Sequence, residues 1–320
     1  MAQFDDIIKT IDQAVKDFLK KIPATQRAMF DNIDAELRRL DLTSDAKIKA
    51  TVANLKIVSS IKAKLQKLIV SPEYIQDVKN FVKAFNVITN LQNDYWKSIE
   101  ITFKPKPLLK QIRIAAISDT VQSLTGSGIG ANITDKLTGL LRTNVTSGGS
   151  YKALAGELRS QLLSTDTPGL LERYVTSTTI TSINQYNRQY TKAVSDDLGF
   201  EWYAYQGTEI LSSRPFCQAM VESNRYFHVS QIPNLLKGLD AAGGRLKYSD
   251  NKTGEIKPVE ISAKTGLPAG FIPGTNESNF LINAGGYTCG HQTRPVPERN
   301  VPQVDRDIVY NTPAYKRWKG

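Results

Sequence analysis

The chain is poor in the side chains that bind soft metals or carry out thiol chemistry. Its 320 residues include only two cysteines and two histidines. Two cysteines do not make the disulfide framework of a small secreted domain, and a reducing compartment keeps them as thiols or metal thiolates. Any chemistry that needs a thiol or an imidazole, including a zinc site built on these ligands, therefore depends on these four residues.

Long apolar runs are also absent. No window of eighteen or more uncharged apolar residues exists, which excludes a membrane-spanning helix by composition. The first 21 residues are charged at both ends and have helical spacing rather than the pattern of a signal peptide. We therefore expect no membrane partner, and synthesis and folding in a cytoplasm.

Basic residues outnumber acidic ones. The formal net charge is +10, from 41 basic and 31 acidic residues. Such an excess favours an anionic partner, either nucleic acid or an acidic protein surface. The basic residues are dispersed, however, and their densest runs lie on expected helix faces. A solvated helix face is the simpler interpretation of those runs, because long charged helices need one for solubility.

The first hundred residues predict four amphipathic helices, because apolar residues recur at three- and four-residue spacing. Pro23 ends the first helix by removing a backbone donor. Ser44 and Asp45 offer an N-cap for the third helix, whose spacing extends over about 25 residues. Pro72 begins the fourth helix. These apolar stripes must be buried, either in a self-contained bundle or as an arm against a larger assembly.

Two prolines, Pro105 and Pro107, break the helical pattern and favour an extended connection. Helical spacing then resumes and continues with interruptions to about residue 198. The last of these helices, over residues 170–198, is rich in threonine, asparagine, tyrosine and glutamine. Such a polar long helix is expected to be buried among hydrogen-bonding partners or against another subunit.

Residues 200–297 predict a small module of mixed secondary structure. Aromatic alternation indicates a strand over 200–205, and further strands are expected at 226–229 and in a hairpin of 245–248 with 256–261. A turn over 212–217 and a short helix over 235–242 are also expected. The fold class is therefore α+β, with a mainly helical N-terminal two-thirds. The predicted segments are a helical arm or bundle (1–103), a second helical segment (104–199), this module (200–297) and a tail without periodicity (298–320).

All four cysteines and histidines fall within that module, as Cys217, His228, Cys289 and His291. They could bind one structural zinc ion as tetrahedral ligands, although the spacing matches no standard zinc finger. The two cysteines could instead form a disulfide, which the expected compartment opposes. In the third interpretation the thiols are free and buried, and the protein has no cofactor. All three stay open, with free thiols favoured.

Catalysis is a separate possibility. Cys217 or Cys289 with His291 would supply a thiolate nucleophile and its base. Apart from Arg214, three residues before Cys217, nothing in the local sequence argues for a lowered thiol pKa, and no pair of carboxylates suggests hydrolysis. We therefore do not expect an enzyme.

The order of these motifs resembles one protein family. A helix preceded by Gly148-Gly149-Ser150 is followed by a threonine-rich helix carrying Asn184 and by a strand carrying Trp202. The cluster Ser213-Arg214-Pro215-Phe216-Cys217 comes next. After a gap come Gly285-Gly286-Tyr287-Thr288-Cys289-Gly290-His291 and Pro295. This arrangement is similar to the phage Mu F-like minor head proteins of tailed bacteriophages, over roughly residues 137–297.

The resemblance implies a virion component associated with the portal vertex. Its implied partners are the portal protein, the major capsid protein and packaged double-stranded DNA, in head assembly, DNA packaging or DNA exit. The family-motif positions fall on Asn184, Arg214, Cys217, Cys289 and His291. Two departures are present, because Ser213 stands where relatives have an acidic residue and Cys-Gly-His stands where they often have Cys-Arg-Cys.

On this resemblance, the protein is expected in the capsid at the portal vertex, and in the host cytoplasm during assembly. The first hundred residues lie outside the resemblance. The alternative is a zinc- or thiol-dependent enzyme carried with the virion.

Overall fold

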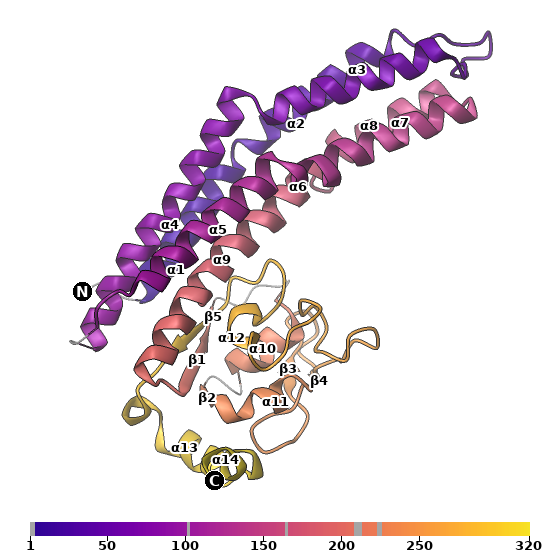
Figure 1. Ribbon diagram of the computed structural model, residues 1–320. Helices are drawn as coiled ribbons and strands as arrows, with labels where there is room; N and C mark the ends of the chain where they lie inside the picture. Colours follow the sequence, from indigo (N-terminus) through magenta and orange to yellow (C-terminus); the bar gives the residue numbers. More distant parts are fainter. Residues whose placement is uncertain (1–3, 101–102, 164–165, 208–212, 223–225) are drawn as a thin grey trace. The chain divides into compact units, whose positions relative to one another are not determined.

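The computed structural model describes residues 4–100, 103–163, 166–207, 213–222 and 226–320 (Figure 1). Helix dominates these residues, and two small antiparallel sheets lie in the C-terminal part, which confirms the α+β class. The long helices are α1 (Phe4–Leu19), α2 (Ile22–Leu37), α3 (Val52–Ile69), α4 (Pro72–Ile99), α5 (Pro107–Thr125), α7 (Asp135–Ser147), α8 (Tyr151–Leu163) and α9 (Leu170–Leu198). The short ones are α6 (Ser127–Ile129), α10 (Pro215–Glu222), α11 (Ile232–Leu235), α12 (Phe280–Asn283), α13 (Gln303–Tyr310) and α14 (Pro313–Lys319). The strands are β1 (Trp202–Gln206), β2 (Tyr226–His228), β3 (Lys247–Ser249), β4 (Ile256–Pro258) and β5 (Gln292–Pro295).

The chain forms two compact units, each built from separate stretches of sequence. Unit 1 comprises Met1–Phe4, Gln92–Arg113 and Ile180–Gly320, and unit 2 comprises Asp5–Leu91 and Ile114–Thr179. Helices α4, α5 and α9 contribute residues to both. The units differ from the four continuous segments predicted from the sequence, because a proline break marks the end of a helix and not the edge of a unit.

Unit 2 buries the apolar stripes that the spacing predicted. Ile7, Ile11 and Phe18 on α1 are buried, and the ring of Phe18 stacks on that of Phe81 from α4 at 5.2 Å between centroids. Leu65 on α3 and Leu158 on α8 are fully buried. Among the described helices, none is both long and apolar enough to cross a membrane.

The third helix is shorter than predicted. It begins at Val52, where the Thr51 hydroxyl accepts a hydrogen bond from the backbone N–H of Asn54 at 3.2 Å. The buried Asn54 amide also bonds the backbone of Asp41 and the carbonyl of Lys49. These bonds hold residues 41–49 in a turn, so the N-cap predicted at Ser44 and Asp45 is wrong.

Unit 1 is organised on the antiparallel sheet β2-β1-β5. Side chains of the central strand β1 alternate between the two faces of the sheet. Tyr203 and Tyr205 join a core with α10, α11 and α12, whereas Trp202 and Ala204 pack with Val296, which follows β5, and with residues of α13. The predicted strands at 200–205 and 226–229 are confirmed, and β3 pairs with β4 as the predicted hairpin.

Several other predictions in this part of the chain are wrong. Cys217 lies on helix α10, not in a turn, because Pro215 begins a helix whose apolar side enters the core; Ser212 lies outside the described residues. The short helix is α11, three residues earlier than expected. Strand β5 was not predicted. The expected tail forms α13 and α14, and the Thr312 hydroxyl caps the second of these helices.

Candidate functional site

Three of the four predicted ligand residues meet in the core of unit 1. Cys217 comes from α10, and Cys289 and His291 precede strand β5, which pairs with β1. The two sulfur atoms are 3.7 Å apart, and the Cys289 sulfur lies 3.6 Å from Nδ1 of His291. All three side chains are buried, and their ligand atoms lie within 4.8 Å of one another. Both cysteines are free thiols.

The fourth polar group of this cluster is Tyr205, which sequence reasoning missed. Its hydroxyl oxygen lies 3.4 Å from the sulfur of Cys217 and 3.8 Å from that of Cys289. Its ring stacks on the imidazole of His291, with centroids 5.4 Å apart. The alternation of strand β1 placed Tyr205 on one face of the sheet, but only the register of β1 with β5 brings it to His291.

His228 does not join the cluster. Its Nδ1 accepts a hydrogen bond from the backbone N–H of Ser230 at 3.1 Å and caps the turn that follows β2. Its ring packs edge-on against Trp202, Tyr315 and Trp318. Burial lowers the pKa of His228 to about 4. The four predicted ligands therefore do not meet in this structure. His228 pairs with Trp202, whose side chain lies on the opposite face of β1 from Tyr205 and the cluster.

Two arginines hold the loop that carries Cys289. Arg188, on α9 and almost fully buried, donates to the carbonyls of Ile282 and Ala284 at 2.9 and 2.8 Å and to that of Cys289 at 2.7 Å. Arg214 donates to the carbonyl of Gly285 at 2.7 Å and also reaches that of Tyr287. The Ile282 carbonyl is in the short helix α12 and the others lie in the loop that follows it. The buried guanidinium of Arg188 thus satisfies backbone acceptors that burial would otherwise leave unmatched.

The backbone at Gly285 also shapes the cluster. Its φ angle is +78°, a region that favours glycine. A Cβ atom at this position would lie 2.2 Å from the Cys289 sulfur and 3.0 Å from the Cys217 sulfur. The loop can therefore approach the two sulfur atoms this closely only because residue 285 has no side chain.

A polar chain connects this site to helices α4 and α9. The Gln292 amide donates to Asn184, and its oxygen accepts from Asn187 at 2.9 Å. Asn187 in turn accepts from Gln92 at 2.6 Å, and Gln92 accepts from the Trp96 indole at 2.9 Å. The expectation that the polar helix lies among hydrogen-bonding partners is confirmed for these residues.

The two thiols share a contact that separates their pKa values. For Cys289, the hydrogen bond with Cys217 is the largest influence, followed by His291 and Arg188. Together they lower the pKa of Cys289 well below its usual value. The same hydrogen bond, together with burial, raises the pKa of Cys217. Burial and the neighbouring thiols raise that of Tyr205. Cys289 is therefore the more acidic of the two thiols, and the thiolate form of cysteine is the one that binds metals or acts as a nucleophile.

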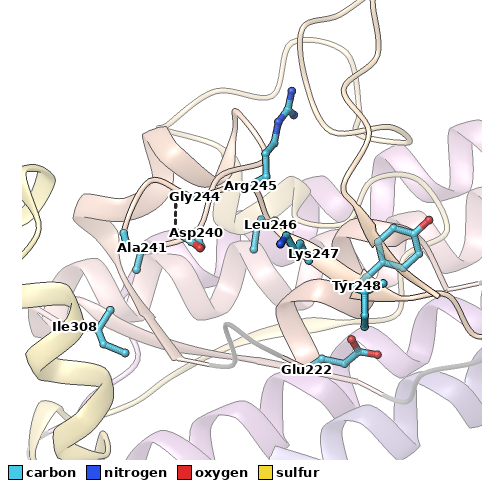
Figure 2. Close-up of a pocket in the computed structure, with 11 residues that line it drawn as sticks. Glu222, Asp240, Ala241, Gly244, Arg245, Leu246, Lys247, Tyr248 and Ile308 are labelled. Carbon is cyan, nitrogen blue, oxygen red and sulfur yellow. Dashed lines mark hydrogen bonds between the residues drawn. The ribbon is translucent and has the colours of Figure 1, made fainter. Parts of the chain in front are cut away.

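A separate hollow of ≈ 700 Å³ opens elsewhere in unit 1 (Figure 2). It is lined by Glu222, residues 240–248 in part, Ile256 and Ile308, and the Gly244 backbone N–H donates to the Asp240 carboxylate at 2.8 Å. It shares no residue with the Cys/His cluster. Its lining mixes acidic, basic and apolar side chains without a convergent set of polar groups, so it indicates no particular ligand.

Comparisons with protein-family models, with curated proteins and with solved structures found no match. The interpretation of the site therefore depends on its own geometry. Sequence reasoning missed Arg188 and Tyr205. The one available signal for Arg188 was an arginine within an otherwise uncharged polar stretch of a long helix.

Proposed function

We propose that the protein is a structural component of the head of a tailed bacteriophage, associated with the portal vertex. In this role the Cys/His cluster maintains the fold of unit 1 and does not turn over a substrate. The portal protein and the major capsid protein are the proposed partners, and the protein acts in head assembly, DNA packaging or DNA exit.

One observation carries the proposal. The five family-motif residues are separated by up to 107 positions along the chain, yet they surround a single loop. Asn184 accepts from Gln292 beside His291, Arg214 binds the carbonyl of Gly285, and Cys217 contacts Cys289. Motif residues that all contact one loop or its neighbours are expected to stabilise the fold of that region. This supports a structural role, as the resemblance to minor head proteins implies.

The test is the location of the chain in phage lysates. Lysates of the strain that carries the gene are fractionated on a density gradient, and the chain is quantified by mass spectrometry. The proposal predicts that it co-sediments with DNA-filled particles, in few copies relative to the major capsid protein. Finding all of the chain in the soluble fraction of a lysate rich in particles would contradict it.

The proposed contact with packaged DNA has its own test. The net charge of +10 favours phosphate contacts that do not depend on base sequence. Binding to random double-stranded DNA should weaken steeply between about 50 and 200 mM salt, as counterion release requires. Absence of binding at low ionic strength would remove the DNA role and leave the assembly role in place.

The alternative is a virion-carried enzyme, and the lowered pKa of Cys289 beside His291 favours it. Burial opposes it, because only 4% of Cys289 is exposed and a substrate would have to displace packed side chains. Cys289→Ser distinguishes the two. The enzyme alternative predicts intact particles without the activity, whereas the structural proposal predicts lost folding or lost incorporation.

A further inference from the structure

We propose that Cys217, Cys289, His291 and the hydroxyl group of Tyr205 form a closed tetrahedral site for one zinc ion. The thiolates of Cys217 and Cys289, Nδ1 of His291 and the phenol oxygen of Tyr205 are the four ligand atoms. This inference concerns the purified chain and is independent of the proposed place in a virion.

The separation between the two sulfurs and that between the Cys289 sulfur and Nδ1 of His291 match a tetrahedral zinc site, and the ligand atoms of the three residues lie within 4.8 Å of one another. Zinc–sulfur bonds of about 2.3 Å and zinc–nitrogen bonds of about 2.0 Å place two sulfur ligands about 3.8 Å apart, and a sulfur and a nitrogen about 3.5 Å apart. The observed values are 3.7 Å between the two sulfurs and 3.6 Å from the Cys289 sulfur to Nδ1 of His291.

The phenol oxygen of Tyr205 has the separation expected of the fourth ligand. Oxygen and sulfur ligands of one tetrahedral zinc ion lie about 3.5 Å apart. The Tyr205 oxygen lies 3.4 Å and 3.8 Å from the two sulfurs. Two packed thiols alone would also sit near 3.7 Å, but packing does not require the Tyr205 oxygen to contact both sulfurs or an imidazole nitrogen to contact the Cys289 sulfur.

The surrounding backbone lies directly against the cluster and holds its position. The Gly285 backbone approaches the sulfur atoms so closely that a Cβ there would lie 2.2 Å from one and 3.0 Å from the other. Arg188 and Arg214 fix the carbonyls of the loop on either side of Cys289. Such support from outside the ligand set orients metal ligands.

Charge and donor chemistry select zinc. Two thiolates neutralise the charge of a divalent ion, so the buried site carries no net charge when His291 and Tyr205 stay neutral. Two sulfurs with an imidazole suit zinc, and a tetrahedral arrangement with one oxygen suits it better than copper(I), which prefers soft ligands alone. Zinc binds the two sulfurs as thiolates, and any proton that they carry in the metal-free protein is released to solvent as the zinc–sulfur bonds form.

A site closed by four protein ligands has no open position for water, which is typical of structural and not catalytic zinc. The ion would join α10, β1 and the segment before β5 inside one core. Zinc would therefore stabilise unit 1, and it would not activate a water molecule.

The first experiment measures zinc per chain after expression in zinc-supplemented medium and desalting under reducing conditions. We expect one equivalent in the wild-type protein, and one in His228→Asn, which keeps an N-cap and removes the histidine that lies outside the cluster. We expect less than a tenth of an equivalent in Cys217→Ser and Cys289→Ser. A folded wild-type chain without zinc, or loss of zinc only in His228→Asn, would overturn the site.

Because the serine variants can fail to fold, a second measurement uses the wild-type chain with cobalt(II) in place of zinc. A tetrahedral site with two thiolates gives intense visible bands and a sulfur-to-cobalt charge-transfer band. An octahedral spectrum without charge transfer would overturn the proposal.

Tyr205→Phe tests the fourth ligand, because it keeps the ring and removes the oxygen. We expect about tenfold weaker zinc binding. Added imidazole should shift the cobalt spectrum of Tyr205→Phe and leave the wild-type spectrum unchanged. If imidazole shifts both spectra equally, Tyr205 does not close the site.

Discussion

The two units of this chain are stabilised by different kinds of interaction. Unit 2 buries apolar stripes of leucine, isoleucine and phenylalanine that repeat at helical spacing. Unit 1 buries two thiols, two histidines and the guanidinium of Arg188 among specific acceptors. Apolar burial tolerates exchange of one side chain for another of similar volume, whereas a buried polar network does not, since each lost partner leaves another group unsatisfied.

The largest expected effect comes from Arg188→Met in unit 1. Methionine retains most of the side-chain stem but leaves three carbonyl groups without their donor. We expect a loss of about 4 kcal/mol in the free energy of unfolding, measured by urea titration. The control is Arg173→Met on the same helix, where an exposed guanidinium donates to the carbonyl of Pro168, with an expected loss below about 0.5 kcal/mol. Equal losses in the two variants would contradict the contrast between buried and exposed arginine.

Gly285→Ala should have the next largest effect. The new Cβ would meet the Cys289 sulfur at 2.2 Å, in a backbone conformation that alanine disfavours. We expect a loss of about 3 to 4 kcal/mol in thermal or urea unfolding. Gly290→Ala, five residues away, has no atom within 4 Å of its added Cβ and no positive φ, so it should be nearly neutral. A neutral Gly285→Ala would show that the loop does not approach the sulfur atoms.

In unit 2, Leu65→Ala tests burial of an apolar stripe. Leu65 is fully buried, so the truncation should cost about 3 kcal/mol, with Val52→Ala at an exposed position as the control. Under native conditions Leu65→Ala should leave the alkylation rates of Cys217 and Cys289 unchanged, while Arg188→Met should raise them. Faster alkylation in both variants would contradict this contrast, because loss of apolar burial in unit 2 would then expose the thiols of unit 1 as well.

The smallest effect is a pH dependence from His228 in unit 1. Its pKa is about 4 in the folded protein, against about 6.5 in the unfolded chain. The stability from keeping it neutral is present above pH 6.5 and is lost as the pH falls toward 4, because only the unfolded chain gains a proton in that range. The charge of Glu298 opposes the shift only in part. The carboxylate of Glu201 lies 3.5 Å from Nε2 of His228.

We expect the wild-type protein to lose about 2 kcal/mol more than His228→Asn between pH 7 and pH 5. Urea titrations of both proteins at the two pH values measure this difference. Parallel losses would contradict a buried, neutral His228.

The contrast between periodic apolar stripes and polar contacts between distant residues also explains what could be predicted from the sequence. The stripe of Ile7, Ile11 and Phe18 has a helical period, and Trp202 lies in an aromatic run typical of a strand, so local patterns sufficed for these elements. The partners of Arg188 and Tyr205 lie about 90 residues away, and no local pattern encodes such contacts. His228 was grouped with the cluster on residue type alone, but strand register places it among aromatic rings.

The most direct test of the central claim, that helix α10 and the loop before β5 meet at the two sulfurs, is titration of the metal-free protein with a monosubstituted arsenical. Such a reagent bridges two thiols that lie side by side. We predict one arsenic per chain, with both thiols consumed and the peptides containing Cys217 and Cys289 joined in the mass spectrum. Two arsenic atoms per chain, or a single modified thiol in the folded protein, would contradict it.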